Sequence, residues 1–257
     1  MKSSWAEVRE RRDRLAAVLV QEGYLSVAEL AARFTVSEAT VRRDLSALEK
    51  DKRITRTHGG ALSEFDALFV PFQQRNMQNR EAKQRIARSA LQLLQDGQVL
   101  FLDAGSTVFA VAEAIVESSL ALQVVTNSLP VAEVLTSSPT VETHLLGGCL
   151  LPHQLIVVGS GVTLSLSAWH FDLSLFSAEG MSEQGLWNSQ DDITGFQRHV
   201  HGRSETCAFC LDVSKLGRVA PSFLLPWSLI DRVVSDALPD QITSLGQEAM
   251  GVEWLAA

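Results

Sequence analysis

Residues 36–49, VSEATVRRDLSALE, form the stretch from which the organisation of this chain follows. Ser37 is placed to cap a helix, because its hydroxyl can accept a hydrogen bond from a free amide of the first turn. Val41, Leu45 and Leu48 then recur at helical spacing, which predicts one apolar stripe. The other face of the predicted helix carries polar and charged side chains: Glu38, Thr40, Arg42, Arg43 and Ser46.

Two interpretations of this helix are possible. An apolar back with a front of short hydroxyls and arginines suits entry into the major groove of DNA. The alternative is an ordinary amphipathic helix whose charged face is solvated. The residues on either side favour the first interpretation.

The preceding residues predict a helix-turn-helix. Residues 9–23 pass from charged to apolar side chains and end in a glycine, as an amphipathic helix does. Ser26 is placed to cap a short second helix over residues 27–34, and Thr35-Val36 makes a tight connection to the stretch above. Two short helices joined by such a turn are typical of the helix-turn-helix.

The following residues, 51–63, predict a small β-hairpin, or wing. Ile54 and Thr57 alternate with polar residues before the break at Gly59-Gly60. The basic side chains of this segment are expected to lie along a phosphate backbone: they are Arg53, Arg56 and His58.

The overall composition is that of a folded protein. The chain has 257 residues, of which 46% are hydrophobic and 20% charged. No apolar run reaches the roughly 18 residues of a membrane span, and the charged start does not resemble a signal peptide. Together with the three cysteines, this predicts a cytoplasmic protein without disulfides and without a membrane partner.

Charge is distributed unevenly along the chain. Residues 1–62 contain 12 basic and 9 acidic residues, whereas the remainder contains 10 and 21. A basic small end on an acidic large end indicates that only the first meets a polyanion, although a chance fluctuation would look the same.

Cys207 and Cys210, with His199 and His201 close in sequence, have residue types that can bind a metal or form a redox pair. Residues 205–212 have the pattern of a strand, and residues three apart on a strand point to opposite faces. The two thiols should therefore not converge, and we expect buried cysteines and no metal or cofactor.

The larger part of the chain alternates strands and helices. We interpret residues 63–80 as a linker, with Phe65, Phe69 and Phe72 packing on one domain or on a partner subunit. From residue 81, strands are predicted over 99–105, 122–128, 141–148, 171–177, 206–212, 230–235 and 252–255, with helices between the early ones. Such alternation predicts a mostly parallel sheet covered by helices, and hence an α/β domain.

Polar loops follow three of these strands. Ligands of open α/β sheets bind beyond the carboxyl ends of the strands, where helix N-termini offer free amides. Any one of the loops could be an ordinary helix cap, but three in succession favour a polar crevice. Their residues are Asp103, Gly105, Ser106 and Thr107, then Asn127 and Ser128, then Gly147 and Gly148.

The first part of the chain resembles the DNA-binding half of DeoR-family bacterial transcriptional regulators, through residues 36–49 and the run TRTHGGA at 55–61. The resemblance implies that the second helix of the motif reads the operator. Arg42 and Arg43 are about 100° apart on a helix, so one of them should clamp phosphate. Asp44 either holds an arginine in place or is a solvated charge. The residues expected to face the groove are Ser37, Glu38, Thr40, Arg42 and Arg43.

The remainder resembles the effector domain of the same family, whose fold is similar to that of sugar-phosphate isomerases. The resemblance runs through LDAGST (102–107), VVTNS (124–128), LLGG (145–148), FSAEG (176–180) and LDVSKLGR (211–218). It implies a pocket for a phosphorylated sugar, lined by the polar loops above and by a later loop with Asp212, Ser214 and Lys215. Lys215 either meets the phosphate or is a solvated surface lysine.

Two departures from the family pattern concern this pocket. The family commonly has Gly-Ala-Asp-Gly where this chain has residues 177–180, SAEG, and a lysine where this chain has Gln197 beside Arg198. FSAEG followed by Gly-Leu-Trp at 185–187 resembles the fucose-operon regulators. That resemblance implies a deoxysugar phosphate such as fuculose 1-phosphate, with Glu179 accepting sugar hydroxyls and Trp187 stacking on a ring. Trp187 could equally be a core residue.

These observations predict a two-domain regulator: a winged helix-turn-helix over 1–62, a linker over 63–80 and a sensor of Rossmann-like parallel-sheet fold over 81–257. The expected function is repression of a sugar-catabolic operon, with release from operator DNA by a phosphorylated sugar. A half-site is too short for specificity in a genome, so a homo-oligomer, a dimer or tetramer, is expected. The alternative is a sugar-phosphate isomerase with an accessory DNA-binding module; no catalytic residues are assigned, because Glu179 and Asp103 lack an evident paired acid.

Overall fold

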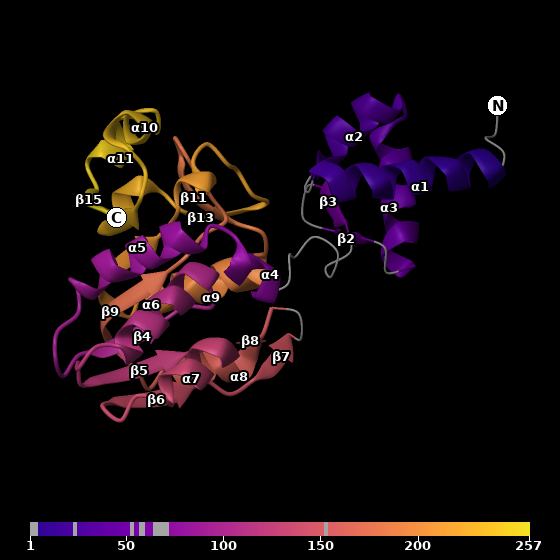
Figure 1. The fold of residues 1–257 in the computed structure, drawn as a ribbon. Helices are drawn as coiled ribbons and strands as arrows, with labels where there is room; N and C mark the ends of the chain where they lie inside the picture. Colours follow the sequence, from indigo (N-terminus) through magenta and orange to yellow (C-terminus); the bar gives the residue numbers. More distant parts are fainter. Residues whose placement is uncertain (1–4, 23–24, 52–53, 57–59, 64–71, 152–153) are drawn as a thin grey trace. The chain divides into compact units, whose positions relative to one another are not determined.

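The structure, a computed structural model, describes residues 5–22, 25–51, 54–56, 60–63, 72–151 and 154–257. It divides into two compact units, Met1–Val70 and Pro71–Ala257, each described here by itself. Figure 1 shows a small helical unit at the N-terminal end of the chain and a larger α/β unit. Among the described residues, no helix is long and apolar enough to span a membrane.

Unit 1 is a winged helix-turn-helix. Its helices are α1 (Trp5–Glu22), α2 (Val27–Phe34) and α3 (Glu38–Lys50), and its sheet has the order β1 (Leu25–Ser26), β3 (Gly60–Ser63), β2 (Ile54–Arg56). All strand pairs are antiparallel, with Thr55 opposite Leu62 in the wing. The predicted hairpin is therefore confirmed in its strands, while Gly59, Thr57 and the predicted helix end at Gly23 lie outside the described residues.

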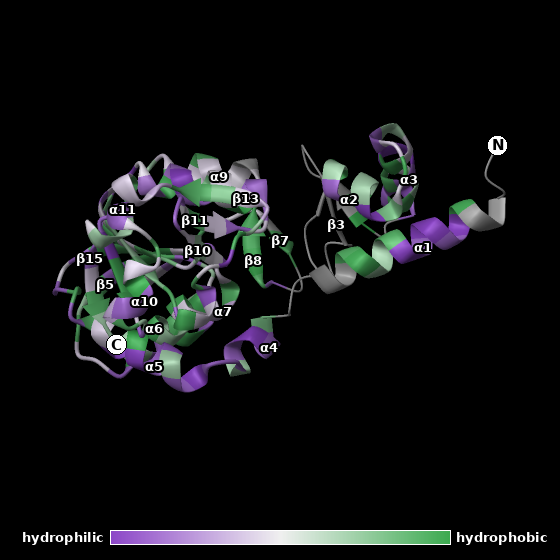
Figure 2. Ribbon diagram, turned by 90° about the horizontal axis from the view of Figure 1, so that it is seen from above, coloured by the Kyte–Doolittle hydropathy of each residue, from purple (hydrophilic) through white to green (hydrophobic). Residues whose placement is uncertain are grey.

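Among the described residues of unit 1, one apolar cluster joins the three helices. It joins Leu15 and Leu19 of α1 to Leu30 of α2 and to the three stripe residues of α3, all of them fully buried. The change in α1 from a hydrophilic to a hydrophobic stretch is visible in Figure 2. Burial of these side chains, at roughly 1.5–3 kcal/mol each, gives a small domain its core.

Unit 2 is built on a seven-stranded sheet in which every pairing is parallel. The strand order is β15 (Glu253–Ala256), β14 (Arg232–Ser235), β12 (Ser204–Cys210), β9 (Phe171–Phe176), β4 (Val99–Leu102), β5 (Leu122–Thr126) and β6 (Val141–Leu145). All seven of these strands were predicted, with differences of a few residues at their ends.

Both faces of the large sheet are covered. On β4, Leu100 and Leu102 belong to the apolar cluster that also contains α5 (Arg80–Leu91), α6 (Ser106–Val116) and α7 (Leu129–Leu135), whereas Phe101 belongs to the other cluster. That second cluster includes residues of α8 (Ser160–Leu166) and α9 (Asp191–His201). The alternation of a strand explains this division, and continuous apolar strands are typical of a sheet buried on both faces.

Smaller elements complete unit 2. A second sheet has the order β10 (Gly180–Ser182), β11 (Gly185–Asn188), β13 (Ser222–Leu225), and β7 (Cys149–Leu151) pairs with β8 (Ile156–Val158). The remaining short helices are η1 (Val213–Lys215), η2 (Trp227–Leu229), α10 (Pro239–Thr243) and α11 (Gln247–Met250). None of these was predicted from the sequence, since short elements give weak periodic signals.

The predicted linker differs from the structure in its second half. Phe72–Met77 forms a helix, α4, which belongs to unit 2 together with the start of α5 at Arg80. Phe72 is buried and its ring meets Phe109 of α6 edge-to-face at 5.3 Å between centroids. Phe72 therefore packs within unit 2, while Phe65 and Phe69 lie outside the described residues.

Candidate functional site

The start of α3 is capped as the sequence predicted. Ser37 is the N-cap, and its Oγ accepts a hydrogen bond of 3.2 Å from the amide of Thr40. The turn before it is tight, with Thr35 at a φ of 54° and the amide of Val36 bonded to the carbonyl of Ala31. This cap and turn set where the helix begins, and hence which residues stand at its exposed end.

The face of α3 opposite the core carries the predicted reader residues. Glu38, Arg42 and Arg43 are exposed, and Thr40 is half-buried. Arg42 Nη2 lies 2.8 Å from Glu38 Oε2, one helical turn earlier. A surface depression on this face is lined by Arg42, Arg43, Ser46, Ala47 and Lys50.

Asp44 is an anchor for two arginines. The residue is 2% exposed, and its carboxylate accepts hydrogen bonds from Nε of Arg11, at 2.7 Å, and Nε of Arg12, at 2.9 Å. Of the two possibilities left open by the sequence, a held arginine is confirmed. These two ion pairs hold α1 against α3, and α3 is the helix whose exposed face is basic.

The wing residues can be placed only in part. Arg56 ends β2, but its side chain is outside the described residues, as are Arg53 and His58 entirely. Their predicted contacts with phosphate therefore stay predictions.

In unit 2, Asp103 follows β4 and is buried, with 4% of it exposed. Its Oδ2 accepts a hydrogen bond of 2.7 Å from Nε2 of Gln197 on α9. Burial raises the pKa of Asp103 above its usual value, opposed by hydrogen bonds from Ala104, Gln197 and Ser177 and by the charge of Arg75. The site thus contains a carboxylate whose ionised form is disfavoured by its removal from water.

The loop after β4 lies against the loop after β9. A Cβ atom on Gly105 would lie 2.5 Å from Cβ of Ser177, so the close approach requires glycine. Ser106 and Thr107, in the first turn of α6, are buried at 8% and 2% exposure. The structure brings these predicted residues together at the carboxyl ends of the strands.

The loop after β5 is also buried. Ser128 caps α7, and its Oγ accepts from the amide of Val131 at 3.4 Å. Asn127 donates to the carbonyl of Val157 at 3.5 Å, while its Oδ1 is buried without a hydrogen-bond partner. An unsatisfied acceptor of this kind is unusual in a folded protein and is a candidate for ligand contact.

Gly147 and Gly148, after β6, are exposed. A Cβ on Gly148 would lie 2.6 Å from the carbonyl oxygen of Val158, whereas Gly147 has nothing within 4 Å. At Gly148 the structure therefore gives a packing reason for glycine.

Glu179 and Trp187 have partners within the protein. Ser189 Oγ donates to Glu179 Oε2, and the backbone amide of Glu179 bonds to the carbonyl of Trp187 at 2.9 Å. The indole of Trp187 is half-buried, donates to Ser182 Oγ at 2.8 Å and meets Phe223 edge-to-face. These contacts favour packing as the role of Trp187, one of the two roles that its sequence context left open.

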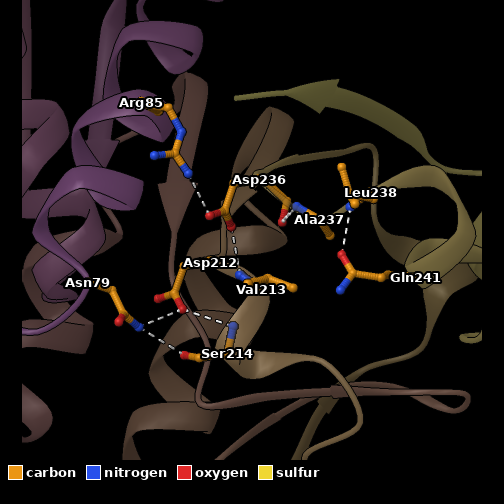
Figure 3. A network of polar contacts seen from close by, with 10 residues as sticks. Asn79, Arg85, Asp212, Val213, Ser214, Asp236, Ala237, Leu238 and Gln241 are labelled. Atoms are coloured by element: carbon orange, nitrogen blue, oxygen red, sulfur yellow. Dashed lines mark hydrogen bonds and ion pairs between the residues drawn. The ribbon is translucent and has the colours of Figure 1, made fainter.

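A polar network holds the loop after β12 (Figure 3). Asp212 Oδ1 accepts from the amide of Ser214, at 3.0 Å, and from Nδ2 of Asn79, at 3.1 Å. On the neighbouring loop, Asp236 accepts from the amide of Val213 at 2.7 Å and pairs with Arg85 of α5 at 3.0 Å. Lys215 lies on the loop after β12, three residues beyond Asp212. Burial lowers the pKa of Lys215, although the carboxylates of Asp212 and Glu179 raise it.

Sequence reasoning missed two basic residues of this site. Arg75, on α4, interacts electrostatically with Glu179 and Asp103, and Lys83, on α5, with Asp212 and Lys215. Burial lowers the pKa of Lys83 to about 8, and its Nζ donates to the carbonyls of Arg75 and Gln78. A signal for Lys83 was available, because it shares a helical stripe with Ile86, Ala87 and Ala90, where a lysine is out of place.

Gln197 occupies the position where a family lysine was expected. Its amide donates to Asp103 and to the carbonyl of Ser177 at 2.9 Å, and accepts from Nδ2 of Asn188 at 3.0 Å. The neighbouring Arg198 instead bonds the carbonyls of Phe223 and Leu224. Gln197 is therefore the inward-facing residue of the pair.

Several buried polar atoms have no hydrogen-bond partner among the residues that the structure describes. They are Arg75 Nε, Asn127 Oδ1, Thr143 Oγ1, Gln190 Nε2 and Thr194 Oγ1. Gln190 and Thr194 stand at the first turn of α9, the helix that carries Gln197. Each such group costs roughly 1–3 kcal/mol if it remains unpaired, so a polar ligand would relieve the cost of those it reached.

The cysteines of β12 face opposite sides of the sheet, as predicted. Cys207 belongs to one apolar cluster and Cys210 to the other, and burial raises the pKa of both thiols to about 12. Thiols with such pKa values are inert at neutral pH.

Both units match models of known domains. Residues 11–65 match a DeoR-like helix-turn-helix domain, and residues 78–237 match a DeoR C terminal sensor domain.

Curated proteins similar over nearly the whole chain include the glycerol-3-phosphate regulon repressor of Escherichia coli (strain K12), 32% identical over 90% of this chain and 91% of that protein. The HTH-type transcriptional repressor GlcR of Bacillus subtilis (strain 168) is 31% identical over 95% of this chain and 96% of its own length. The lactose phosphotransferase system repressor of Streptococcus mutans is 31% identical over 90% and 93%.

Solved structures are more distant. Ribose 5-phosphate isomerase A of Methanocaldococcus jannaschii is 19% identical over 53% of this chain and 54% of that chain, with a TM-score of 0.38. The translation initiation factor eIF-2B of Pyrococcus horikoshii OT3 is 13% identical over 88% and 86%, with a TM-score of 0.45.

Proposed function

Because this chain belongs to the DeoR family of transcriptional regulators, we propose that it represses a sugar-catabolic operon and leaves its operator when unit 2 binds a phosphorylated sugar. The proposal has two parts, binding of DNA by unit 1 and binding of an effector by unit 2. Different residues support each part.

Unit 1 supports the DNA part through α3. A helix with a fully buried back and an outer face of Arg42, Arg43 and Lys50 suits the major groove and its phosphate walls. Asp44 keeps this helix in register with α1. One recognition helix reads only a half-site, so we propose that the active form is a homo-oligomer with paired reading helices.

One observation carries the effector part: the polar side chains that follow β4 and β5 are buried, and Asn127 Oδ1 among them has no hydrogen-bond partner among the described residues. Charged side chains from other elements act on the carboxylates of this region. The charge of Arg75 acts on Glu179 and Asp103, that of Lys83 on Asp212, and that of Lys215 on Asp212 and Glu179. Basic groups partly withdrawn from water suit a phosphate, and carboxylates and amides suit sugar hydroxyls. Phosphorylated sugars combine both kinds of group in one small molecule.

The names of the relatives agree with this chemistry. Repressors of a glycerol-3-phosphate regulon and of a lactose phosphotransferase system are similar to this chain over nine-tenths of its length. Which sugar phosphate acts here is left to experiment, with fuculose 1-phosphate among the compounds that the sequence suggested.

The test is a gel shift with the DNA upstream of the chain's own operon. The full chain should retard this fragment, and one of glycerol 3-phosphate, ribose 5-phosphate or fuculose 1-phosphate should release it, while the unphosphorylated sugars should not. Failure to bind the fragment would refute the repressor, and binding that no compound alters would refute the effector. Turnover of ribose 5-phosphate at ordinary enzyme rates would favour an isomerase instead.

A further inference from the structure

Arg75 of α4 is a half-buried arginine whose side chain lacks, within the part of the chain that the structure describes, a hydrogen-bond partner for one buried atom. Its Nε is buried and has no hydrogen-bond partner among the described residues. No ion pair within 4 Å joins it to Asp103 or Glu179, although the charges of both act on it and all three residues are described. A guanidinium carries five N–H donors in a fixed fork, and here an inner donor is withheld from water without a protein acceptor.

This arrangement is costly for the free protein. Burial lowers the pKa of Arg75, which shows that desolvation outweighs the attraction of the two carboxylates. An arginine kept only for packing would gain nothing from a buried, unsatisfied Nε. A buried polar group without a hydrogen-bond partner lowers stability, and one explanation for its presence is that it binds a ligand.

The backbone that carries Arg75 is held from several sides. Phe72, one turn earlier, packs on Phe109 of α6. Lys83 donates to the carbonyl of Arg75 itself, at 2.5 Å, and to that of Gln78, at 2.7 Å. Asn79 adopts a left-handed φ of 49° and donates to Asp212 and Ser214 on the loop that leads to Lys215.

We propose that Arg75 binds the phosphate of the effector directly, together with Lys215. The inference rests on the proposed function and adds a residue that the sequence had placed in a linker. Phosphate accepts two parallel hydrogen bonds from a guanidinium fork, which would satisfy the Nε that the protein leaves unpaired. The carboxylates of Asp103 and Glu179 then remain for the hydroxyls of the sugar.

The position of Arg75 gives this contact a second consequence. α4, which carries Arg75, is the first described element of unit 2 in chain order. A ligand that binds α4 differently in two states of the protein shifts the balance between them. Arg75 should therefore be needed for release from the operator as well as for affinity.

Arg75→Met in the full chain separates a ligand-binding role from a structural one. Methionine has a similar length and no buried donor to satisfy, so the Tm should be equal to or higher than that of the wild type. Calorimetric titration should show the affinity for the active sugar phosphate, and for inorganic phosphate, reduced at least 30-fold. Operator binding without effector should stay within twofold, and release should need correspondingly more sugar phosphate.

Two further variants complete the test. Arg75→Lys keeps the charge but not the fork, and should bind the sugar phosphate about tenfold more weakly. Arg88→Gln removes an exposed arginine of α5 and should behave as the wild type.

Each contrary result is informative. A clear drop in Tm for Arg75→Met would assign Arg75 to structure and overturn the inference. Unchanged affinity in a variant of normal Tm would overturn it while leaving the proposed function intact. A wild-type protein that binds no compound of the panel would overturn both.

Discussion

The carboxylate of Asp44 on α3 lies 2.7 Å from Nε of Arg11 on α1, in a position where Asp44 is almost fully buried. Arg12 binds its other oxygen. A helix that is proposed to read DNA needs a fixed orientation, and this charged contact holds the core side of α3 while its opposite face stays exposed.

Asp44→Asn should loosen this contact. The amide keeps the shape but faces two arginines without a negative charge, so unit 1 should lose about 1–3 kcal/mol of stability. Hydrogen exchange should show faster exchange of the α1 and α3 amides, with unit 2 unchanged, and operator affinity should fall. Asp51→Asn, at the exposed end of α3, is the matched control. Normal protection in Asp44→Asn would contradict the anchoring role.

The two arginines of α3 should differ in what they read. Counting 100° per residue from the buried stripe, Arg43 points most nearly away from the core, while Arg42 lies to the side and pairs with Glu38. We expect Arg43 to contact bases and Arg42 to contact phosphate.

Salt titrations of operator binding distinguish the two roles. Arg42→Gln should lower the slope of log affinity against log salt by about 1, on operator and random DNA alike. Arg43→Gln should cost about 1–3 kcal/mol on the operator and little on random DNA. The reverse pattern would exchange the two assignments.

The close approach of Gly105 to Ser177 is testable by a double-mutant cycle. Gly105→Ala places a methyl group where Cβ of Ser177 stands at 2.5 Å, so unit 2 should lose about 1–3 kcal/mol. Ser177→Gly in the same chain should recover much of that loss. Gly147→Ala, with nothing within 4 Å, should change stability by less than about 0.5 kcal/mol. Additive effects of the two substitutions would show that the contact is not the cause.

Asp103→Asn tests the cost of the buried carboxylate. Burial raises the pKa of Asp103 in the folded state above its ordinary value of 3.8. At a pH above 3.8 the ionised carboxylate therefore lowers the free energy of unfolding. The Tm of Asp103→Asn should therefore exceed that of the wild type at pH 7.5, and the gain should shrink as the pH falls toward 4. Affinity for the sugar phosphate should fall at the same time. A Tm difference that does not depend on pH would contradict this account.

Local pattern was sufficient for the main elements. The cap at Ser37, the stripe of Val41, Leu45 and Leu48, and the seven strands of the large sheet follow from residues within a few positions of each other. The opposite orientation of Cys207 and Cys210 follows equally from the period of a strand. The short elements and the helix α4 were missed, because six residues containing one apolar anchor do not form a periodic pattern.

The candidate effector site was foreseen only in its loops. Asp103, Asn127 and Asp212 could be placed at the carboxyl ends of strands by topology, but their partners come from distant parts of the chain: Gln197 lies 94 residues from Asp103 and Asn79 lies 133 from Asp212. Arg75 and Lys83 come near this site only because α4 and α5 pack on α6, whose first turn holds Ser106 and Thr107.

The sequence by itself thus determined the two domains, the helix α3 with its cap and apolar stripe, and the order of strand and helix, since these depend on periodicity and caps that neighbouring residues supply. Only the tertiary structure decided that Asp44 serves as an anchor, that Gln197 rather than Arg198 faces Asp103, and that the charges of Asp103 and Glu179 act on Arg75. Desolvation and hydrogen bonding between distant side chains govern these outcomes, and neither can be computed until the chain has brought those side chains together.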